Sequence, residues 1–153
     1  MKRRHGFTLI ELIVVMIILG LLASISILKY LDLTRSARSS EVIGAFAVIR
    51  LAAYNYEADH NNQWPADASP GVTPPELIPY LPGGFVFGGR DYTLDWENFT
   101  GGGGGGGFML GITCTSTDAA LAQKLIQILG NSAPYYVVGN SLTYMIIDPS
   151  GNY

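Results

Sequence analysis

The sequence predicts an α+β fold in which a long amino-terminal helix, first transmembrane and then amphipathic, packs on a small antiparallel β-sheet head with one extra helix. Three observations predict it. Residues 7–28 are almost wholly apolar, residues 29–61 continue a helical pattern without proline, and residues 62–153 contain short strand-like runs between glycine and proline residues. The fold class follows from this change of apolar period along the chain.

Residues 7–28 are long enough to cross a membrane as a helix. At about 1.5 Å per residue the segment is roughly 33 Å long, compared with a hydrocarbon core of about 30 Å. A Lys-Arg-Arg run at residues 2–4 precedes it, which predicts a cytoplasmic amino terminus and places the chain beyond Lys29 outside. The one charge of the segment is Glu11, and an ionisable side chain at such a position indicates a functional site.

Residues 29–61 are expected to form the amphipathic half of the same helix. Apolar residues recur there at helical spacing: Val42, Ala45, Phe46, Ile49, Ala52, Ala53 and Tyr56. Asn61-Asn62 and Trp64-Pro65 end the pattern, as a helix stop should. A continuous helix from Phe7 to about His60 would be roughly 80 Å long, and the apolar stripe on its outer half must pack against a further part of the chain.

Residues 62–153 predict a β-rich head. A connector rich in proline and glycine, residues 65–84, comes first. Strand-like runs then follow at residues 84–87, 92–99, 108–115, 135–138 and 142–147. Either Gly139-Asn140 or Asn140-Ser141 makes a tight turn between the last two runs. The seven consecutive glycines at 101–107 form a flexible loop between two strands.

One further helix is expected between the strands of the head. Thr117 would be its N-cap, Asp118 would lie in its first turn, and Gly130 would cap its carboxyl end. Its core-facing side chains are expected to be Leu121, Leu125 and Ile128, which recur at helical spacing.

Composition and charge exclude several functions. The formal charge is −3 and becomes −6 if residues 2–4 are removed. The only cations beyond the long helix are Arg90 and Lys124, which argues against a nucleic-acid surface. A single cysteine, Cys114, excludes an internal disulfide, and we expect its thiol to be buried.

The chain carries no pattern that predicts an enzyme. The glycine tract 101–107 is followed by Phe108-Met109, whereas a phosphate-binding loop needs a lysine and a serine or threonine there. The two histidines, His5 and His60, lie far apart and only one cysteine is present. This set offers neither a zinc site of known spacing nor a recognisable nucleophile and base.

The string Gly6-Phe7-Thr8-Leu9-Ile10-Glu11 resembles the processing site of type IV pilins and of the pseudopilins of type II secretion systems. The resemblance implies that a prepilin peptidase cuts after Gly6 and N-methylates the new amine of Phe7. It also implies that Glu11 pairs with that amine on a neighbouring subunit. In this interpretation the chain divides into a leader at 1–6, a filament-core segment at 7–28, an amphipathic segment at 29–61 and a head at 62–153.

Two other interpretations of the amino terminus remain open. Ser24-Ile25-Ser26 could be the cleavage site of a secretory signal peptide, although the preceding apolar run is longer than the 7–15 residues usual there. The segment could also be a plain single-pass anchor in which Glu11 reaches back to the membrane interface. The topology is the same for an anchor and for a pilin.

The resemblance implies a structural subunit of a type IV pilus-like filament or of a secretion pseudopilus. The implied partners are the prepilin peptidase and methylase, other pilin subunits and an inner-membrane assembly platform. The implied location is the cytoplasmic membrane, with the head outside, and then a periplasmic or surface filament. The alternative is a minor pilin whose head binds a surface, DNA or a secreted cargo. Two features depart from many relatives: Leu28 stands where they have proline, and the head has no disulfide.

The carboxyl terminus contains weak calcium candidates. Major pseudopilins resemble one another in a calcium-binding loop near this end, and Asp148 and Asn152 offer oxygen atoms within a turn-prone stretch. Asp91, Asp95 and Glu97 could lie nearby. Because calcium takes 6–8 oxygen ligands and the tail supplies few carboxylates, a solvated turn is the other interpretation. No other cofactor is expected.

Overall fold

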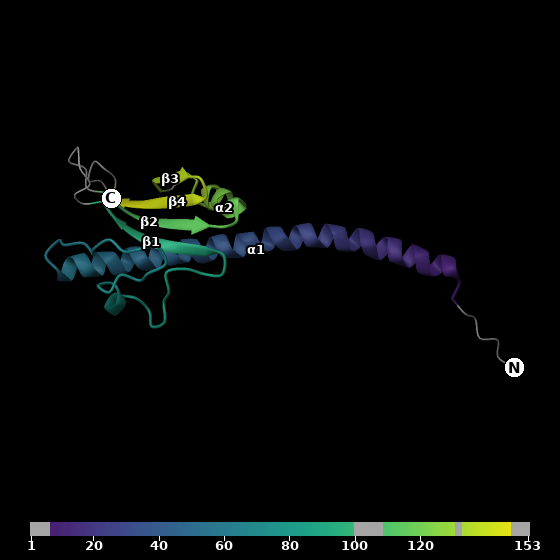
Figure 1. Cartoon of the computed structure of the whole chain (residues 1–153), viewed down its shortest axis with the longest axis horizontal. Coiled ribbons are helices and arrows are strands. Elements are labelled where there is room, and N and C mark those ends of the chain that lie inside the picture. The colour runs from purple at the N-terminus through teal and green to yellow at the C-terminus, as the bar shows by residue number, and fades with distance from the viewer. Residues whose placement is uncertain (1–6, 100–108, 131–132, 148–153) are drawn as a thin grey trace. The chain divides into compact units, whose positions relative to one another are not determined.

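The computed structural model describes residues 7–99, 109–130 and 133–147, and its elements run α1, η1, β1, β2, α2, β3 and β4 along the chain (Figure 1). Their bounds are Leu9–Asp59, Ile78–Tyr80, Tyr92–Asn98, Leu110–Ser116, Ala119–Leu129, Tyr135–Val138 and Ser141–Ile147. The chain forms two compact units that meet between Ala37 and Arg38, within α1. The expected α+β class, with one long apolar helix, a small antiparallel sheet and one further helix, is confirmed.

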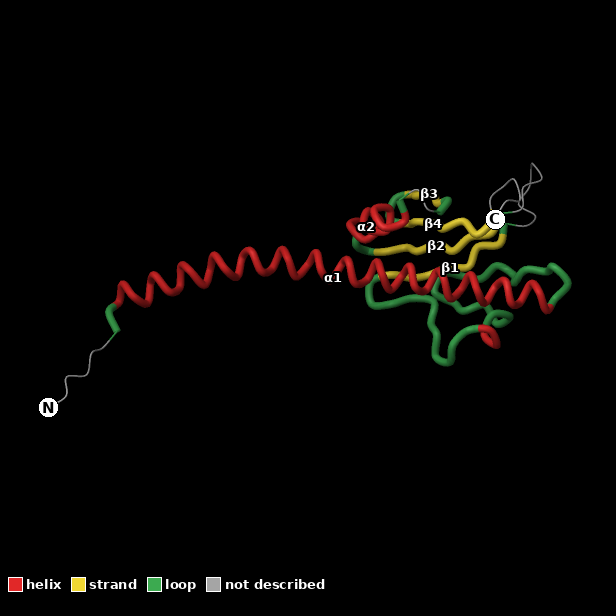
Figure 2. The backbone as a smooth tube through the Cα atoms, turned by 180° about the vertical axis from the view of Figure 1, so that it is seen from behind, coloured by secondary structure: helices red, strands yellow, loops and turns green. Residues whose placement is uncertain are grey.

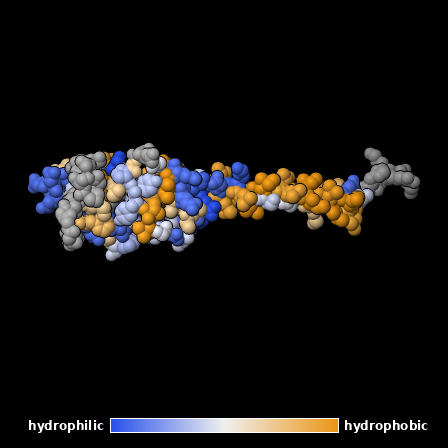
Figure 3. Space-filling view, turned by 90° about the horizontal axis from the view of Figure 1, so that it is seen from above, coloured by the Kyte–Doolittle hydropathy of each residue, from blue (hydrophilic) through white to orange (hydrophobic). Residues whose placement is uncertain are grey.

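The first unit contains the apolar half of α1. All side chains from Phe7 to Leu33 are exposed in the isolated chain, and on the side seen in Figure 3 most of this helical stretch is apolar. Among the described residues, α1 is the one helix that is long and apolar enough to cross a membrane. So large an exposed apolar surface must be covered by lipid or by other protein chains.

In the second unit, the outer half of α1 buries one face, as the stripe predicts. Val42, Phe46 and Ile49 are fully or almost fully buried, as are Ala52 and Ala53 one turn further on. The helix ends where the sequence predicts. Asn61 and Asn62 take left-handed φ angles of 54° and 63°, which asparagine tolerates better than most residues.

The buried face of α1 packs against a four-stranded antiparallel sheet of order β1-β2-β4-β3 (Figure 2). Alternate residues of the strands point into the core. In the middle of the sheet Leu94 of β1 lies opposite Cys114 of β2, which lies opposite Leu142 of β4. All three are buried in the cluster that contains the α1 stripe.

The prediction of a strand at residues 84–87 is wrong. This segment forms no strand, and only an isolated bridge joins the next residue, Gly88, to Thr93. Gly84 takes a φ of 79°, and the Phe85 N–H donates to the carbonyl of Pro82 at 3.0 Å. The Pro-Gly-Gly sequence therefore makes a turn, and of the residues after it Phe85 and Phe87 pack at the core as part of a loop.

The other strands lie close to their expected positions. The two-residue loop between β3 and β4 is Gly139-Asn140, because β4 begins at Ser141. Gly139 has a φ of 59°, which suits glycine at the first position of such a loop. Phe108, expected to begin β2, and the glycine tract 101–107 lie outside the described residues.

Helix α2 begins one residue later than expected. Asp118, not Thr117, is the N-cap, and its Oδ1 accepts from the Ala120 N–H at 3.0 Å. Gly130 ends the helix, as predicted. Leu121, Leu125 and Leu129 form the buried line at i, i+4 and i+8 together with Ala122. Ile128, expected in the core, is 49% exposed because it lies at the edge of that stripe.

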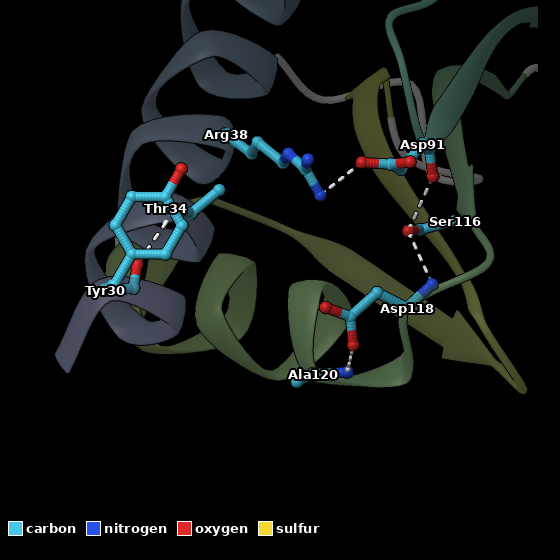
Figure 4. A network of polar contacts seen from close by, with 7 residues as sticks. All are labelled: Tyr30, Thr34, Arg38, Asp91, Ser116, Asp118 and Ala120. Atoms are coloured by element: carbon cyan, nitrogen blue, oxygen red, sulfur yellow. Dashed lines mark hydrogen bonds and ion pairs between the residues drawn. The ribbon is translucent and has the colours of Figure 1, made fainter. Parts of the chain in front are cut away.

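A chain of polar contacts joins the N-cap of α2 to the outer half of α1 (Figure 4). Arg38 of α1 forms an ion pair with Asp91. The Ser116 hydroxyl donates to the carbonyl of Asp91 at 2.9 Å and accepts from the Asp118 N–H at 3.0 Å. The ends of β1, β2 and α2 are thereby held at one place on the helix.

The connector covers the outer edge of β1. The Gly71 N–H donates to the carbonyl of Leu94 at 2.8 Å, and the Trp96 indole donates to the carbonyl of Pro65 at 3.2 Å. Irregular chain thus satisfies polar groups of an edge strand that could otherwise pair with another chain.

Candidate functional site at the amino terminus

Glu11 lies in the first turn of α1 and folds back on the start of the helix. Its Oε2 accepts from the Thr8 N–H at 2.8 Å and from the Thr8 hydroxyl at 2.7 Å. The Thr8 Oγ1 in turn accepts from the Glu11 N–H at 3.4 Å. This reciprocal arrangement is a capping box. Its signature, threonine followed three residues later by glutamate, is present in the sequence but is not among the features predicted from it.

The capping box fixes where the one negative charge of the span lies. The first N–H groups of a helix have no partner within it and carry partial positive charge, so they stabilise a carboxylate at this end. The structure therefore brings Glu11 next to the backbone of Thr8, one residue after Phe7. Phe7 itself is 82% exposed. Gly6, on the other side of the expected cleavage bond, lies outside the described residues.

The remaining polar groups of the apolar segment are satisfied within the helix. The Ser24 hydroxyl donates to the carbonyl of Leu21 at 2.9 Å, and the Ser26 hydroxyl donates to that of Leu22 at 2.8 Å. Because hydrocarbon offers no hydrogen-bond partner, these bonds make the segment compatible with lipid or with an apolar helix bundle. Glu11 is therefore the one group in residues 7–28 that carries charge into that environment.

The calcium prediction is not tested by the structure. Asp148 and Asn152 lie outside the described residues. Of the neighbours considered for the site, Asp91 pairs with Arg38, whereas Asp95 and Glu97 lie close together on β1. Among the described residues, His, Cys, Asp and Glu side chains form no group of three that could hold a metal ion.

The amino terminus of the chain matches a known protein-family model. The family model of the prokaryotic N-terminal methylation motif matches residues 1–27. By this segment the chain is similar to proteins that carry the methylation motif. The matched segment contains every residue of the capping box, and the match ends within the apolar half of α1.

Curated relatives include fimbrial and type IV pilus proteins. The chain is 42% identical over 52 residues to a probable minor fimbrial protein of Dichelobacter nodosus, over 34% of this chain and 33% of that protein. It is 42% identical over 50 residues to a type IV narrow pilus major component of Thermus thermophilus, over 33% and 43% of the two chains. It is 39% identical over 72 residues to a type IV major pilin protein of Neisseria gonorrhoeae, over 47% and 33%.

These alignments span a third to somewhat over two fifths of each relative. No solved structure matches the chain at a significant level.

Proposed function

We propose that this chain is a type IV pilin-like protein, a structural subunit of a type IV pilus-like or type II secretion pseudopilus filament. A prepilin peptidase cleaves it after Gly6 and methylates Phe7, and it polymerises through α1. The observation that carries this proposal is Glu11, the single charge of an apolar span, held at the helix start against Thr8, which follows the Gly6-Phe7 pair in the sequence. The chain is then the substrate of the peptidase and methylase, and does no chemistry of its own.

Cleavage supplies a positive charge that can pair with the Glu11 carboxylate. The new amine of Phe7 has a reference pKa of about 7.7–8.0, so it is largely protonated at neutral pH. In an apolar bundle either charge alone is strongly unfavourable, whereas an ammonium and a carboxylate that pair offset each other's desolvation. In a subunit that has not reached its neighbour, Glu11 stays in its own capping box. Because the ion pair forms only at the correct axial position, it stabilises that position over others.

Packing supplies the rest of the driving force. The exposed side chains of residues 9–28 move from lipid into a protein bundle that is equally apolar, so transfer alone contributes little. Close contact between helices and the Glu11 pair then decide which arrangement forms. An inner-membrane platform is the proposed partner that extracts the helix from the membrane.

A minor pilin is the second candidate function. It has support from the additional helix α2 in the head and from the likeness to a probable minor fimbrial protein. In that case the head binds a surface, DNA or a secreted cargo, and the chain is rare in the filament.

Intact-mass measurement of the protein in sheared surface filaments and in membranes tests the proposal. Abundant chain beginning at N-methylated Phe7 in the sheared fraction supports a major pilus subunit. The same processed form confined to membranes supports a pseudopilin or minor pilin. A chain that still begins at Met1, or one cut after Ser26, contradicts the proposed function.

A further inference from the structure

Two grooves run along the outer half of α1. The first, here the Arg50 groove, encloses about 590 Å³ and is lined by Ala47, Arg50, Leu51 and Tyr54 of α1 with Tyr144 and Met145 of β4. The second, here the Glu41 groove, encloses about 340 Å³ and is lined by Glu41, Gly44, Ala45 and Val48 of α1 with Phe85 and Val86 of the loop before β1. Their walls are mainly apolar, and Leu51 and Val86 are 62% and 68% exposed.

Each groove contains one charged side chain, and the two charges are opposite. Among the residues that the structure describes, Arg50 is the one charged residue that lines the first groove, and Glu41 is the one that lines the second. The two residues are nine positions apart, which is about 2.5 helical turns. They therefore project from opposite sides of α1, with the buried stripe around Phe46 and Ile49 between them.

A tyrosine from the sheet holds each charge in place. Arg50 Nη1 donates to the Tyr144 hydroxyl at 2.8 Å, and the Tyr144 ring stacks on Phe46 with centroids 5.4 Å apart. On the other side, the Tyr92 hydroxyl donates to Glu41 Oε1 at 2.8 Å. Because both phenols are fixed by the core, the two charged groups have lost part of their freedom before any partner arrives, which favours binding.

Neither charge forms an ion pair within the part of the chain that the structure describes. One donor of the Arg50 guanidinium is used by Tyr144, and a guanidinium has five. One oxygen of Glu41 accepts from Tyr92, and a carboxylate can accept about four hydrogen bonds. Each side chain is thus positioned by one bond and can still take a full partner of opposite charge.

We propose that the two grooves meet between copies of this chain, so that Arg50 of one subunit pairs with Glu41 of the next. This inference rests on the proposed filament. Subunits in an open helical filament contact one another through two different patches, not through one self-complementary patch. The opposite flanks of α1 supply two such patches of opposite charge. Parallel copies displaced by nine residues, about 13 Å along the helix, bring Arg50 level with Glu41.

The apolar walls of the two grooves affect how strongly the Arg50–Glu41 pair stabilises the contact. Groove closure removes Leu51 and Val86 from water and lowers the local dielectric around the charges, which strengthens their attraction. A charge in the wrong place leaves an unpaired ion in the closed groove, a larger penalty than at an open surface. The pair therefore fixes which flanks meet and at what axial displacement.

Charge reversal in the full-length protein tests the pairing. We expect R50E and E41R each to lower the yield of sheared filaments about tenfold, and the double variant R50E/E41R to restore most of it, since the coupling of close charge pairs is large. R90E is the matched control, because Arg90 is exposed and lies in neither groove. Circular dichroism of each variant verifies the fold. Normal yield from both single variants, or no rescue in the double variant, overturns the pairing.

Disulfide crosslinking identifies the partner. With R50C and E41C in one chain, mild oxidation of filaments should give a ladder of multimers, because contacts between different patches continue from copy to copy. The native Cys114 does not interfere, since burial raises the pKa of its thiol to about 12. Dimers from R50C or E41C alone mean a self-complementary contact and overturn the proposal, as does a crosslink to a different protein. Filaments of the double-cysteine variant that assemble without forming the ladder contradict the pairing and leave the proposed function intact.

Discussion

At the scale of single residues, substitution can separate the capping contacts of Glu11 from its proposed role in subunit pairing. We expect E11A to insert into the membrane normally, because loss of the cap costs only about 1 kcal/mol. We expect it to lower filament yield at least about tenfold, because no carboxylate remains to pair with the amine of Phe7. E11Q keeps an acceptor for the capping box but has no charge, and we expect it to fail in assembly as E11A does. Quantification of the protein in sheared and membrane fractions measures both, with S24A as the control. Normal assembly of E11Q would limit Glu11 to a capping role.

The titration of the Asp95 carboxyl should make the stability of the head depend on pH. Burial, followed by the nearby charges of Glu97 and Asp67, raises the pKa of its carboxyl to about 6, and its Oδ1 is buried without a hydrogen-bond partner among the described residues. The folded state therefore binds this proton more tightly than the unfolded state, whose pKa is about 3.9. Stability contributed by this group is present below about pH 4 and is lost as pH rises through about 6.

D95N removes that titration. The difference between the wild-type and D95N melting temperatures should be small near pH 4. It should grow in favour of D95N as pH rises to about 7, because the charged Asp95 destabilises only the wild type there. Thermal unfolding of the full chain in detergent, followed by circular dichroism at several pH values, measures the difference. A constant difference across that range would show that the environment of Asp95 does not perturb its titration.

Single residues differ in how far the sequence alone predicts their roles. Gly6, Phe7 and Glu11 stand within one short motif, so their pattern can be recognised without a fold. Arg50 and Glu41 could not be singled out, because their positions depend on Tyr144 and Tyr92, which lie 94 and 51 residues away. A charge on an amphipathic helix is ordinarily solvated, and only the tertiary structure places it in a groove.

At the scale of elements, α2 depends on its N-cap. Asp118 accepts from the Ala120 N–H at 3.0 Å, and N-cap to alanine changes cost about 1 kcal/mol on average. We expect D118A to lower the free energy of unfolding by about that amount and D118S to preserve it. T117A should have little effect, because Thr117 is exposed and precedes the cap. Denaturant unfolding measures all three. Equal losses of stability from T117A and D118A would contradict the assignment of Asp118 as the N-cap.

The elements also show where local patterns fail. Alternation predicted β1 and β4 within a residue or two, because their side chains alternate between core and outer face. The run at 84–87 has the same apolar character but follows a Pro-Gly-Gly turn, and β1 already receives hydrogen bonds from the connector at Gly71. Ile128 matched the helical period and still lies outside, since the period identifies a stripe and the sheet decides which part of it is covered.

At the scale of the whole molecule, the division into two units follows from the sequence only in part. The change from apolar to amphipathic pattern after residue 28 is local and was visible. The sheet order β1-β2-β4-β3 places β4 between strands that precede it, and no local pattern determines such long-range pairing. The core cluster begins at Val42, so residues 38–153 contain the packed residues of the head and residues 7–37 supply the apolar surface.

This division predicts that residues 38–153 fold without the apolar segment and remain monomeric. The buried residues of the described head come from this range, so its core is complete. Its two grooves supply one ion pair per contact, and a pair of partly exposed charges contributes at most about 1 kcal/mol outside a filament, too little to hold free heads together. Cooperative unfolding, and a monomer mass by sedimentation at micromolar concentration, are the expected results. Stable multimers of the fragment would mean that head contacts, rather than the helices of residues 7–28, drive assembly.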